Sequence, residues 1–376
     1  MKKLYFLGSG ANYKNIWKHV FSHGTKKDID RLEDYLSKRY SGKAITTKNG
    51  RTALYFALKT YLRPGDEVIV NGFTCYAVVE ALKAAKIKPI YADISKDDLN
   101  FTSETIEKAI RGKNPRAIIV QNSLGNVVDI QTIEKLAKKY NLLIIEDLAH
   151  SAGAKYADGR EAGTVGIATA LSFGKEKSID TISGGAVILR GAGLNEARPE
   201  IPVKRAQVSD TLRARFYPLL GAITRGLAHV RLNGLFMGIL LKIHWVEKSA
   251  DNRLDASRRI SKFEAKLALE QLEALKPSSE RKLRSFYLVD NRDEVLKELK
   301  ASGYYFNGIW YERPISPERY YKKAHFPEED CPVAVFVAEH IVNMPNYYTK
   351  KELLPAYSII KKHILSEPSA KERTNG

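Results

Sequence analysis

The stretch Leu142-Leu143-Ile144-Ile145-Glu146-Asp147 is a short apolar run that ends in two carboxylates. A second stretch, Ala170-Leu171-Ser172-Phe173-Gly174-Lys175-Glu176-Lys177, leads from an apolar segment to a lysine. Apolar runs that alternate with helical patterns predict buried strands of a mostly parallel α/β sheet covered on both faces. Because ligands bind beyond the carboxyl ends of such strands, we expect Asp147 and Lys177 to lie at one edge of the sheet.

These two side chains suggest a cofactor. A lysine amine forms a Schiff base with a carbonyl, and an aspartate pairs with a pyridinium nitrogen. Enzymes that use pyridoxal 5'-phosphate (PLP) require both of these interactions. Taken alone, Asp147 fits a structural or metal-binding role as well, and Lys175-Glu176-Lys177 fits a solvated turn. No second acidic cluster with metal spacing accompanies Asp147. The spacing from Ser172 favours Lys177, because the serine can bind the cofactor phosphate while the lysine reaches its aldehyde.

Further candidates come from three other places. Asn49-Gly50-Arg51-Thr52 precedes a helical pattern, and helix N-termini attract phosphate; the alternative is a simple cap with the arginine in solvent. His150 is a candidate partner of the cofactor's phenolic oxygen, and its alternative is a packing histidine. Asn122 follows an apolar run and has the same candidate role, with turn chemistry as its alternative.

The alternation of helix and strand runs from residue 49 to about 190. It predicts helices over 52–58, 78–85, 102–110 and 130–140, and strands over 67–70, 88–93, 117–120, 142–145 and 184–189. For a chain of 376 residues we expect more than one lobe. The expected parts are an N-terminal segment (1–30), a large PLP-binding domain (31–200), an apolar and basic insert (201–255), a small C-terminal α+β domain (256–365) and a disordered tail (366–376).

Charge and cysteine content narrow the class of protein. The chain has 61 basic and 43 acidic residues, a formal charge of +18, which favours anionic partners. No zinc finger, aromatic RNA-binding motif or basic helical arm accompanies the charge, so nucleic acid is not expected. Cys75 and Cys331 cannot build a disulfide framework and have no metal-type spacing. The first apolar run is too short for a signal peptide, so we expect a cytoplasmic protein without a bound metal.

The segment 212–246 interrupts the α/β pattern. It holds two apolar runs, 216–223 and 235–241, and neither reaches the roughly 20 residues that span a bilayer. One interpretation is a pair of helices lying on the inner face of the membrane, with Trp245 and the arginines at the headgroup level. The other, which the sequence favours, is a dimer interface or a lid over the active site.

The ordered motifs resemble the DegT/DnrJ/EryC1/StrS aminotransferases, PLP enzymes that act on sugar nucleotides. The similarity lies in 49–54 (NGRTAL), 64–70 (PGDEVIV), 145–150 (IEDLAH) and 172–177 (SFGKEK), and covers about 30–190 well and 255–360 loosely. It implies fold-type I, with a large domain and a smaller C-terminal α+β domain, and a homodimer with active sites at the subunit interface. It also implies site roles: Lys177 for the Schiff base and proton transfer, Asp147 at the ring nitrogen, His150 at the phenolic oxygen, and Gly50, Arg51, Thr52 and Ser172 at the phosphate.

Two positions depart from the family pattern. Cys75 stands where an aromatic usually stacks on the ring, and 257–260 (SRRI) stands where the family has Asn-Tyr-Arg-Met. The asparagine that crosses to the partner's phosphate is then absent or supplied from elsewhere, such as Asn252. The resulting hypothesis is amino transfer from an amino acid, glutamate, to a nucleotide-linked keto sugar for surface polysaccharide or amino-sugar synthesis. Two alternatives stay open: a PLP-dependent sugar dehydratase, and a non-catalytic membrane-surface or partner-binding protein on a degenerate fold.

Overall fold

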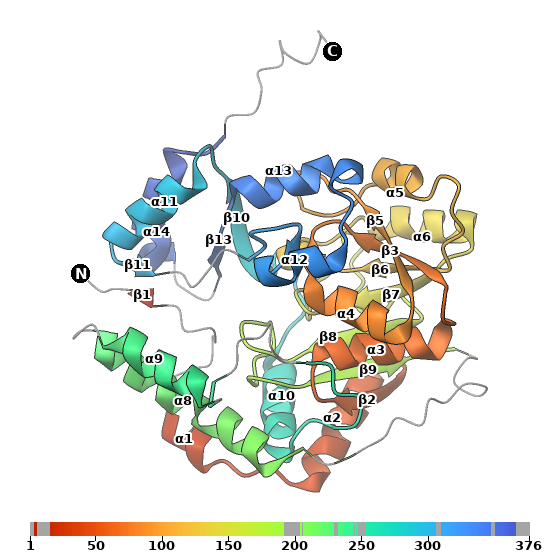
Figure 1. Cartoon of the computed structure of the whole chain (residues 1–376). Helices are drawn as coiled ribbons and strands as arrows, with labels where there is room; N and C mark the ends of the chain where they lie inside the picture. Colours follow the sequence, from red (N-terminus) through yellow and green to blue (C-terminus); the bar gives the residue numbers. More distant parts are fainter. Residues whose placement is uncertain are drawn as a thin grey trace.

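The computed structural model describes residues 4–5, 16–191, 204, 206–228, 232–243, 245–246, 253–305, 310–346 and 350–365. Its centre is a seven-stranded sheet (Figure 1). The strand order is β2 (Lys43–Thr47), β9 (Gly185–Leu189), β8 (Ala168–Ser172), β7 (Leu143–Asp147), β6 (Ala117–Val120), β3 (Glu67–Asn71) and β5 (Lys88–Ala92). All neighbouring pairs from β8 to β5 are parallel, and β9 is antiparallel to both β8 and β2. The predicted mostly parallel sheet is therefore confirmed.

Both faces of this sheet are covered by helices. On β3, Val68 and Val70 join one apolar cluster while Ile69 joins the other, as the alternation of side chains along a strand requires. The first cluster includes α3 (Gly50–Tyr61), α4 (Tyr76–Ala85) and α13 (Pro332–His340); the second includes α2 (Lys26–Arg39), α5 (Ser103–Ala109), α6 (Ile130–Tyr140) and α10 (Lys262–Ala274). Burial on both faces explains why the strands are almost wholly apolar.

Short polar side chains cap the N-termini of several helices that cover the sheet. Asn49 caps α3 through its Oδ1, which accepts the backbone N–H of Thr52 at 2.9 Å. Thr102, Asp129 and Ser261 cap α5, α6 and α10 in the same way. Each cap satisfies an N–H group that the helix leaves without an internal partner. The helices predicted over 52–58, 78–85, 102–110 and 130–140 are confirmed, with small shifts at their ends.

A third apolar cluster lies between β10 (Arg284–Leu288), β13 (Ile341–Pro345), α11 (Arg292–Ala301) and α14 (Lys350–Lys361). Strands β10 and β13 pair antiparallel. Four two-residue strands form two further parallel pairs: β1 (Leu4–Tyr5) pairs with β11 (Tyr304–Tyr305), and β12 (Ile315–Ser316) with β4 (Thr74–Cys75). The remaining short helices are α1 (Ile16–Phe21), α12 (Glu318–Ala324), η2 (Ser123–Gly125) and η4 (Glu328–Asp330). The boundaries of the domains stay a prediction, and the tail 366–376 lies outside the described residues.

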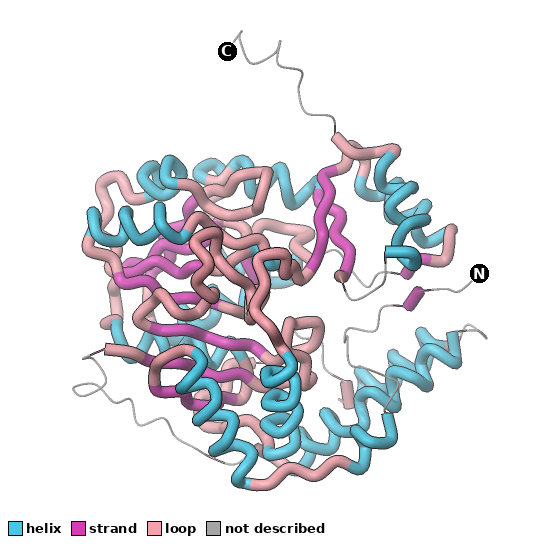
Figure 2. Tube along the Cα trace, turned by 180° about the vertical axis from the view of Figure 1, so that it is seen from behind, coloured by secondary structure: helices cyan, strands magenta, loops and turns pink. Residues whose placement is uncertain are grey.

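The segment predicted as an apolar insert forms two helices, α8 (Val208–Ala228) and α9 (Asn233–Lys242). They pack against each other around Tyr217, Leu240 and Val246, and α8 also contacts α1 and α10. Figures 1 and 2 show this pair on the same side of the central sheet as α11 and α14. No helix of the described part of the chain is long and apolar enough to cross a membrane.

Candidate active site

The end of β7 carries two carboxylates that point to opposite sides. Glu146 is fully buried, and its oxygens accept the Tyr156 hydroxyl at 2.8 Å and backbone N–H groups from the loop at 163–166. Asp147 is 8% exposed and accepts the backbone N–H of Ala149 at 3.0 Å. Glu146 therefore holds the following loop in place, whereas Asp147 is left for the edge of the sheet where ligands bind.

The two lysines after β8 have different surroundings. The Lys175 ammonium lies over the ring of Tyr217 in α8, at 4.9 Å from its centroid. The Lys177 ammonium lies over the ring of Trp310, at 4.6 Å, and interacts electrostatically with Asp147. Lys177 is therefore the lysine that the structure brings to the same place as Asp147.

Burial changes the proton affinity of both groups. It lowers the pKa of Lys177, against the opposing charges of Asp147 and Glu176, because an ammonium is poorly solvated there. It also raises the pKa of Asp147, although the Ala149 N–H and Lys177 act in the other direction. Part of the Lys177 side chain remains accessible. A lysine of this kind is more readily neutral, and thus more nucleophilic, than a lysine in water.

The N-terminus of α3 lies against the end of β8. A Cβ added to Gly50 would be 2.5 Å from the Ser172 Cβ and 2.8 Å from its Oγ. A Cβ added to Gly185 on β9 would be 2.7 Å from the backbone nitrogen of Gly50. Only residues without a side chain permit this approach, which brings the first amides of a 12-residue helix beside the Ser172 hydroxyl. Free helix amides next to a hydroxyl are suited to bind a phosphate group.

Arg51 and Thr52 have other partners in the structure. The Arg51 guanidinium is paired with Glu80 of α4 at 2.7 Å. Thr52 is fully buried, and its hydroxyl lies 3.0 Å from the Asn49 Oδ1 and 3.2 Å from the backbone nitrogen of Asp255. In these positions Arg51 brings a positive charge close to the helix N-terminus, and Thr52 anchors the loop at 253–257 to it.

His150 is buried beneath aromatic rings. Its Nδ1 accepts the backbone N–H of Leu124 at 3.2 Å, so the neutral ring carries its proton on Nε2, which lies 3.4 Å from the Tyr311 hydroxyl. The ring of Trp310 lies at 5.1 Å. Burial, with Lys177 and Arg284 as smaller causes, holds the pKa of His150 well below its usual range. His150 is thus a neutral hydrogen-bonding group at neutral pH.

Asn122 is fully buried in a left-handed backbone conformation, with φ at 52°. Its amide nitrogen donates to the Ser151 hydroxyl at 3.2 Å, and its Oδ1 accepts the backbone N–H of Val128 at 3.0 Å. The oxygen thus stabilises the turn after β6, and the nitrogen links this turn to the loop after β7. These contacts match the turn chemistry that was the alternative for this residue.

Cys75 begins α4 and is half-buried. Its sulfur accepts the backbone N–H of Ala77 at 3.5 Å and interacts electrostatically with Lys177. The neighbouring Tyr76 turns away and stacks on Tyr320, with ring centroids 4.7 Å apart. The structure therefore places the thiol, and not the adjacent aromatic ring, beside the lysine.

A network from the C-terminal part of the chain adds groups that the sequence did not predict. The Glu176 carboxylate accepts the Arg284 guanidinium at 2.8 Å and the indole N–H of Trp310 at 2.9 Å. Arg284 also donates to the Asn343 Oδ1 at 2.8 Å and lies over the Trp310 ring at 4.3 Å. Strands β10 and β13 are thus linked to the loop that carries Lys177. No local motif marks these residues, because the contacts join positions 59 to 134 residues apart.

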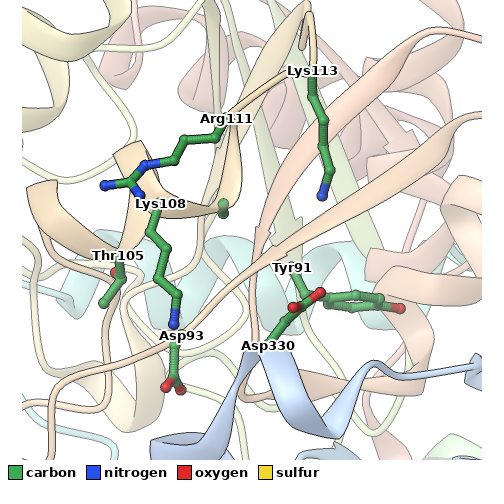
Figure 3. A pocket seen from close by; sticks show the side chains of 8 residues that line it. Tyr91, Asp93, Thr105, Lys108, Arg111, Lys113 and Asp330 are labelled. Atoms are coloured by element: carbon green, nitrogen blue, oxygen red, sulfur yellow. The ribbon is translucent and has the colours of Figure 1, made fainter.

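A separate pocket of about 220 Å³ lies at the edge of the sheet near β5 and α5 (Figure 3). Lys108, Arg111 and Lys113 line it together with Asp93 and Asp330. None of the predicted site residues lines this pocket. The Asp93 carboxylate accepts the backbone N–H groups of Val333 and Ala334 at 3.0 and 2.9 Å, and so begins α13. The pocket is therefore not part of the site around Lys177.

The residues around Lys177 fit PLP at three points. The Lys177 amine, next to the Asp147 carboxylate, suits an aldehyde and a ring nitrogen. The Gly50–Ser172 contact, which any side chain at Gly50 would prevent, brings the N-terminus of α3 beside the Ser172 hydroxyl, and such a pair suits a phosphate. Cys75 lies beside the amine and offers a small apolar surface to a ring.

Comparison with known proteins identifies the family. A model of the DegT/DnrJ/EryC1/StrS aminotransferase family matches residues 19–215, which is more than half of the chain. The chain belongs to this family. Within the DegT/DnrJ/EryC1/StrS family it is 30% identical, over 281 residues and 73% of each chain, to the UDP-2-acetamido-2-deoxy-3-oxo-D-glucuronate aminotransferase of Pseudomonas aeruginosa. It is 26% identical to the GDP-perosamine synthase of Caulobacter vibrioides over 315 residues, 81% of this chain and 80% of that protein.

The fold comparison agrees. A DegT/DnrJ/EryC1/StrS aminotransferase from Brucella abortus, solved as a crystal structure, matches with a TM-score of 0.69 at 22% identity and covers 95% of this chain and 99% of that chain. The predicted family and the fold-type I class are thereby confirmed, and the chain is an aminotransferase. The assignment of individual site residues remains a prediction, which rests on the geometry around Lys177.

Proposed function

We propose that this aminotransferase transfers an amino group from an amino acid, glutamate, to a keto sugar carried on a nucleoside diphosphate, with PLP as cofactor. The observation that carries this proposal is the Lys177 amine beside Asp147, with the Gly50–Ser172 contact at the N-terminus of α3. Both named relatives act on nucleotide sugars by name, one on a UDP sugar and one that makes GDP-perosamine. The net charge of +18 suits a diphosphate substrate. The product would be an amino sugar for surface polysaccharide or related synthesis.

Each site residue has one task in this proposal. Bound PLP supplies a carbonyl for amines and a ring that accepts electrons. Lys177, whose pKa burial lowers, binds the carbonyl and moves the proton at the reacting substrate carbon. Asp147 holds a proton at the ring nitrogen, and the neutral His150 offers a hydrogen bond at the ring's phenolic side. The Ser172 hydroxyl and the Gly50 amide bind the phosphate, with Arg51 and Thr52 supporting that end of α3.

The remaining parts of the proposal concern assembly. We propose that the chain acts as a cytoplasmic homodimer whose active sites lie near the subunit interface. The Ser257 hydroxyl donates to Asp255 of its own chain at 2.7 Å, so Ser257 is an unsuitable substitute for the cross-subunit asparagine. Asn252, the other candidate, lies outside the described residues. Sedimentation of the PLP-bound protein tests the dimer.

The direct test of the cofactor site is the visible absorption spectrum with PLP. We expect the wild type to show the band of lysine-bound PLP, to be fixed covalently by borohydride, and to lose the band with glutamate. Lys177→Ala should show none of these effects. Lys175→Ala is the matched control, because that neighbouring lysine faces Tyr217, and it should keep the band. A Lys177→Ala protein that still fixes PLP, or a Lys175→Ala protein that loses the band, would refute the assignment of Lys177.

The two alternatives make different predictions. A sugar dehydratase of this family is expected to have lost the lysine, so the position of Lys177 beside Asp147 disfavours it. Analysis of the sugar product distinguishes an added amino group from a lost hydroxyl. A non-catalytic binding protein predicts a wild type without the PLP band, or with bound PLP and no transfer to any nucleotide-linked keto sugar. Either of these results would replace the aminotransferase proposal.

A further inference from the structure

Helix α9 is apolar on two sides. Its ten residues, NGLFMGILLK, contain one charged side chain, Lys242. One side packs onto α8 through Leu240, which is 6% exposed. A helix that is apolar all round is normally buried on all sides. The second side of α9 is therefore expected to be covered by something in the working protein.

The second side is a regular stripe, which we call the outer face of α9. It consists of Leu232, Leu235, Ile239 and Ile243, at intervals of three, four and four residues, which align side chains along one side of a helix. Their exposed fractions are 50, 67, 49 and 54%. Single exposed apolar residues are common, but four in one row form a continuous surface that marks an interaction site.

The sequence that contains this face has charges of one sign. From residue 211 to 246 the sequence has five lysines and arginines and no aspartate or glutamate. Lys242 is exposed beside Ile243, and Trp245, which follows, is 37% exposed. Helix α1, which contacts α8, adds Trp17 and Phe21, at 62 and 68% exposed. Aliphatic residues flanked by cations and tryptophan are the composition of helices that lie in the headgroup region of a membrane.

We propose that the outer face of α9 docks on an anionic lipid bilayer. Helix α9 has ten residues, about 15 Å in length, which is half of what a bilayer core requires. Helix α8 is longer but contains Pro218 and two arginines near its beginning, Arg213 and Arg215. Neither helix can cross the membrane, so α9 lies in the plane of the surface, with its outer face toward the acyl chains and Lys242 among the lipid phosphates.

A second copy of the chain is the other candidate for this face. Two outer faces brought together would place Lys242 of both copies at one interface, and 211–246 has no acidic residue to pair with it. Like charges in contact oppose such an interface, whereas the same charges attract anionic lipids. The docking proposal is independent of the chemistry at Lys177, because no residue of the outer face touches that site.

The test is sedimentation of the PLP-bound full chain with lipid vesicles. We expect binding to vesicles of phosphatidylcholine with one third phosphatidylglycerol, no binding to phosphatidylcholine alone, and weaker binding at high salt. Leu235→Ser/Ile239→Ser should weaken binding by about tenfold or more, because two apolar side chains no longer enter the bilayer. Lys242→Ala should weaken it by about fivefold, the effect of one cation at a charged surface.

Leu354→Ser is the matched control, because Leu354 is 61% exposed on α14, distant in sequence from α9. It should bind vesicles as the wild type does, and all variants should keep the PLP band. Absence of wild-type binding to the anionic vesicles would overturn the proposal, as would equal binding by the Leu235→Ser/Ile239→Ser protein. If that variant instead dissociates a dimer while its vesicle binding is unchanged, the outer face belongs to a second copy.

Discussion

Replacing Gly50 by alanine tests the phosphate end of the site with one methyl group. The added Cβ would be 2.5 Å from the Ser172 Cβ, whereas carbon atoms in contact lie about 3.5–4.0 Å apart. Ser172 and the start of α3 must therefore separate by about 1 Å. Overpacking of this kind costs about 1–3 kcal/mol, and the higher helix propensity of alanine offsets at most about 1 kcal/mol of it.

The larger expected effect is on cofactor affinity. A 1 Å displacement removes the Ser172 hydroxyl from hydrogen-bonding distance of a phosphate, and hydrogen bonds to charged groups contribute about 1.5–3 kcal/mol. We therefore expect the dissociation constant of PLP to rise by about 10- to 100-fold. Titration of the cofactor-free protein with PLP, followed through the visible band, measures this constant.

Gly226→Ala is the control, because a Cβ at Gly226 in α8 would meet no atom within 4 Å. It should bind PLP with wild-type affinity and be equally stable or slightly more so. Urea unfolding of both cofactor-free variants separates loss of stability from loss of binding. A folded Gly50→Ala protein that binds PLP as tightly as the wild type would show that the phosphate lies elsewhere.

Three further predictions concern the lysine and its neighbours. Glu176→Gln should reduce the free energy of unfolding by about 2 kcal/mol in urea, because it leaves the buried Arg284 cation without its counterion; an unchanged midpoint would show that the pair is dispensable. PLP should protect Cys75 from a thiol reagent, while Cys331, whose pKa burial raises to about 12, should stay unreactive with or without cofactor; peptide mapping identifies the labelled site. The rate at which Lys177 captures PLP should rise with pH and level off below the usual lysine pKa, because burial lowers the pKa of Lys177. Between the pKa of the folded and that of the unfolded protein, the unfolded chain binds the additional proton at this lysine. The free energy of unfolding should therefore increase with pH in this range. Stopped-flow absorbance measures the rate, and a rise that continues to the pKa of a free lysine would contradict the burial argument.

Local patterns in the sequence were sufficient to predict the strands of the central sheet and the residues at the ends of these strands. The end of β7 at Asp147 and the loop after β8 at Lys177 follow from short apolar runs that a buried sheet demands. The resemblance implied a cofactor role for Asp147, but the sequence indicated no role for the neighbouring Glu146. The structure shows that Glu146 accepts backbone N–H groups from the loop at 163–166 and therefore holds this loop.

Residues from distant parts of the chain were missed for a physical reason. Arg284 and Trp310 contact Glu176 across 108 and 134 positions, and no helical or strand period connects such positions. Asn122 was predicted near the cofactor because it follows a strand, and that role stays a prediction; its left-handed conformation and its hydrogen bond from Val128 could not be read from the sequence. The two helices of the insert followed from composition, whereas the side of α9 left uncovered depends on how it packs on α8.

The link from Glu176 to Arg284 and Asn343 also determines when the site can be completed during synthesis of the chain. Asn343 is 166 positions after Lys177 (343 − 177), and a ribosome adds about 5–20 residues per second. The strands of the central sheet are complete by Leu189, so the lysine emerges roughly 10 to 30 seconds before the last residue that holds its loop. A nascent chain thus has the reactive amine before its surroundings are finished, and the C-terminal strand acts as the step that completes the site.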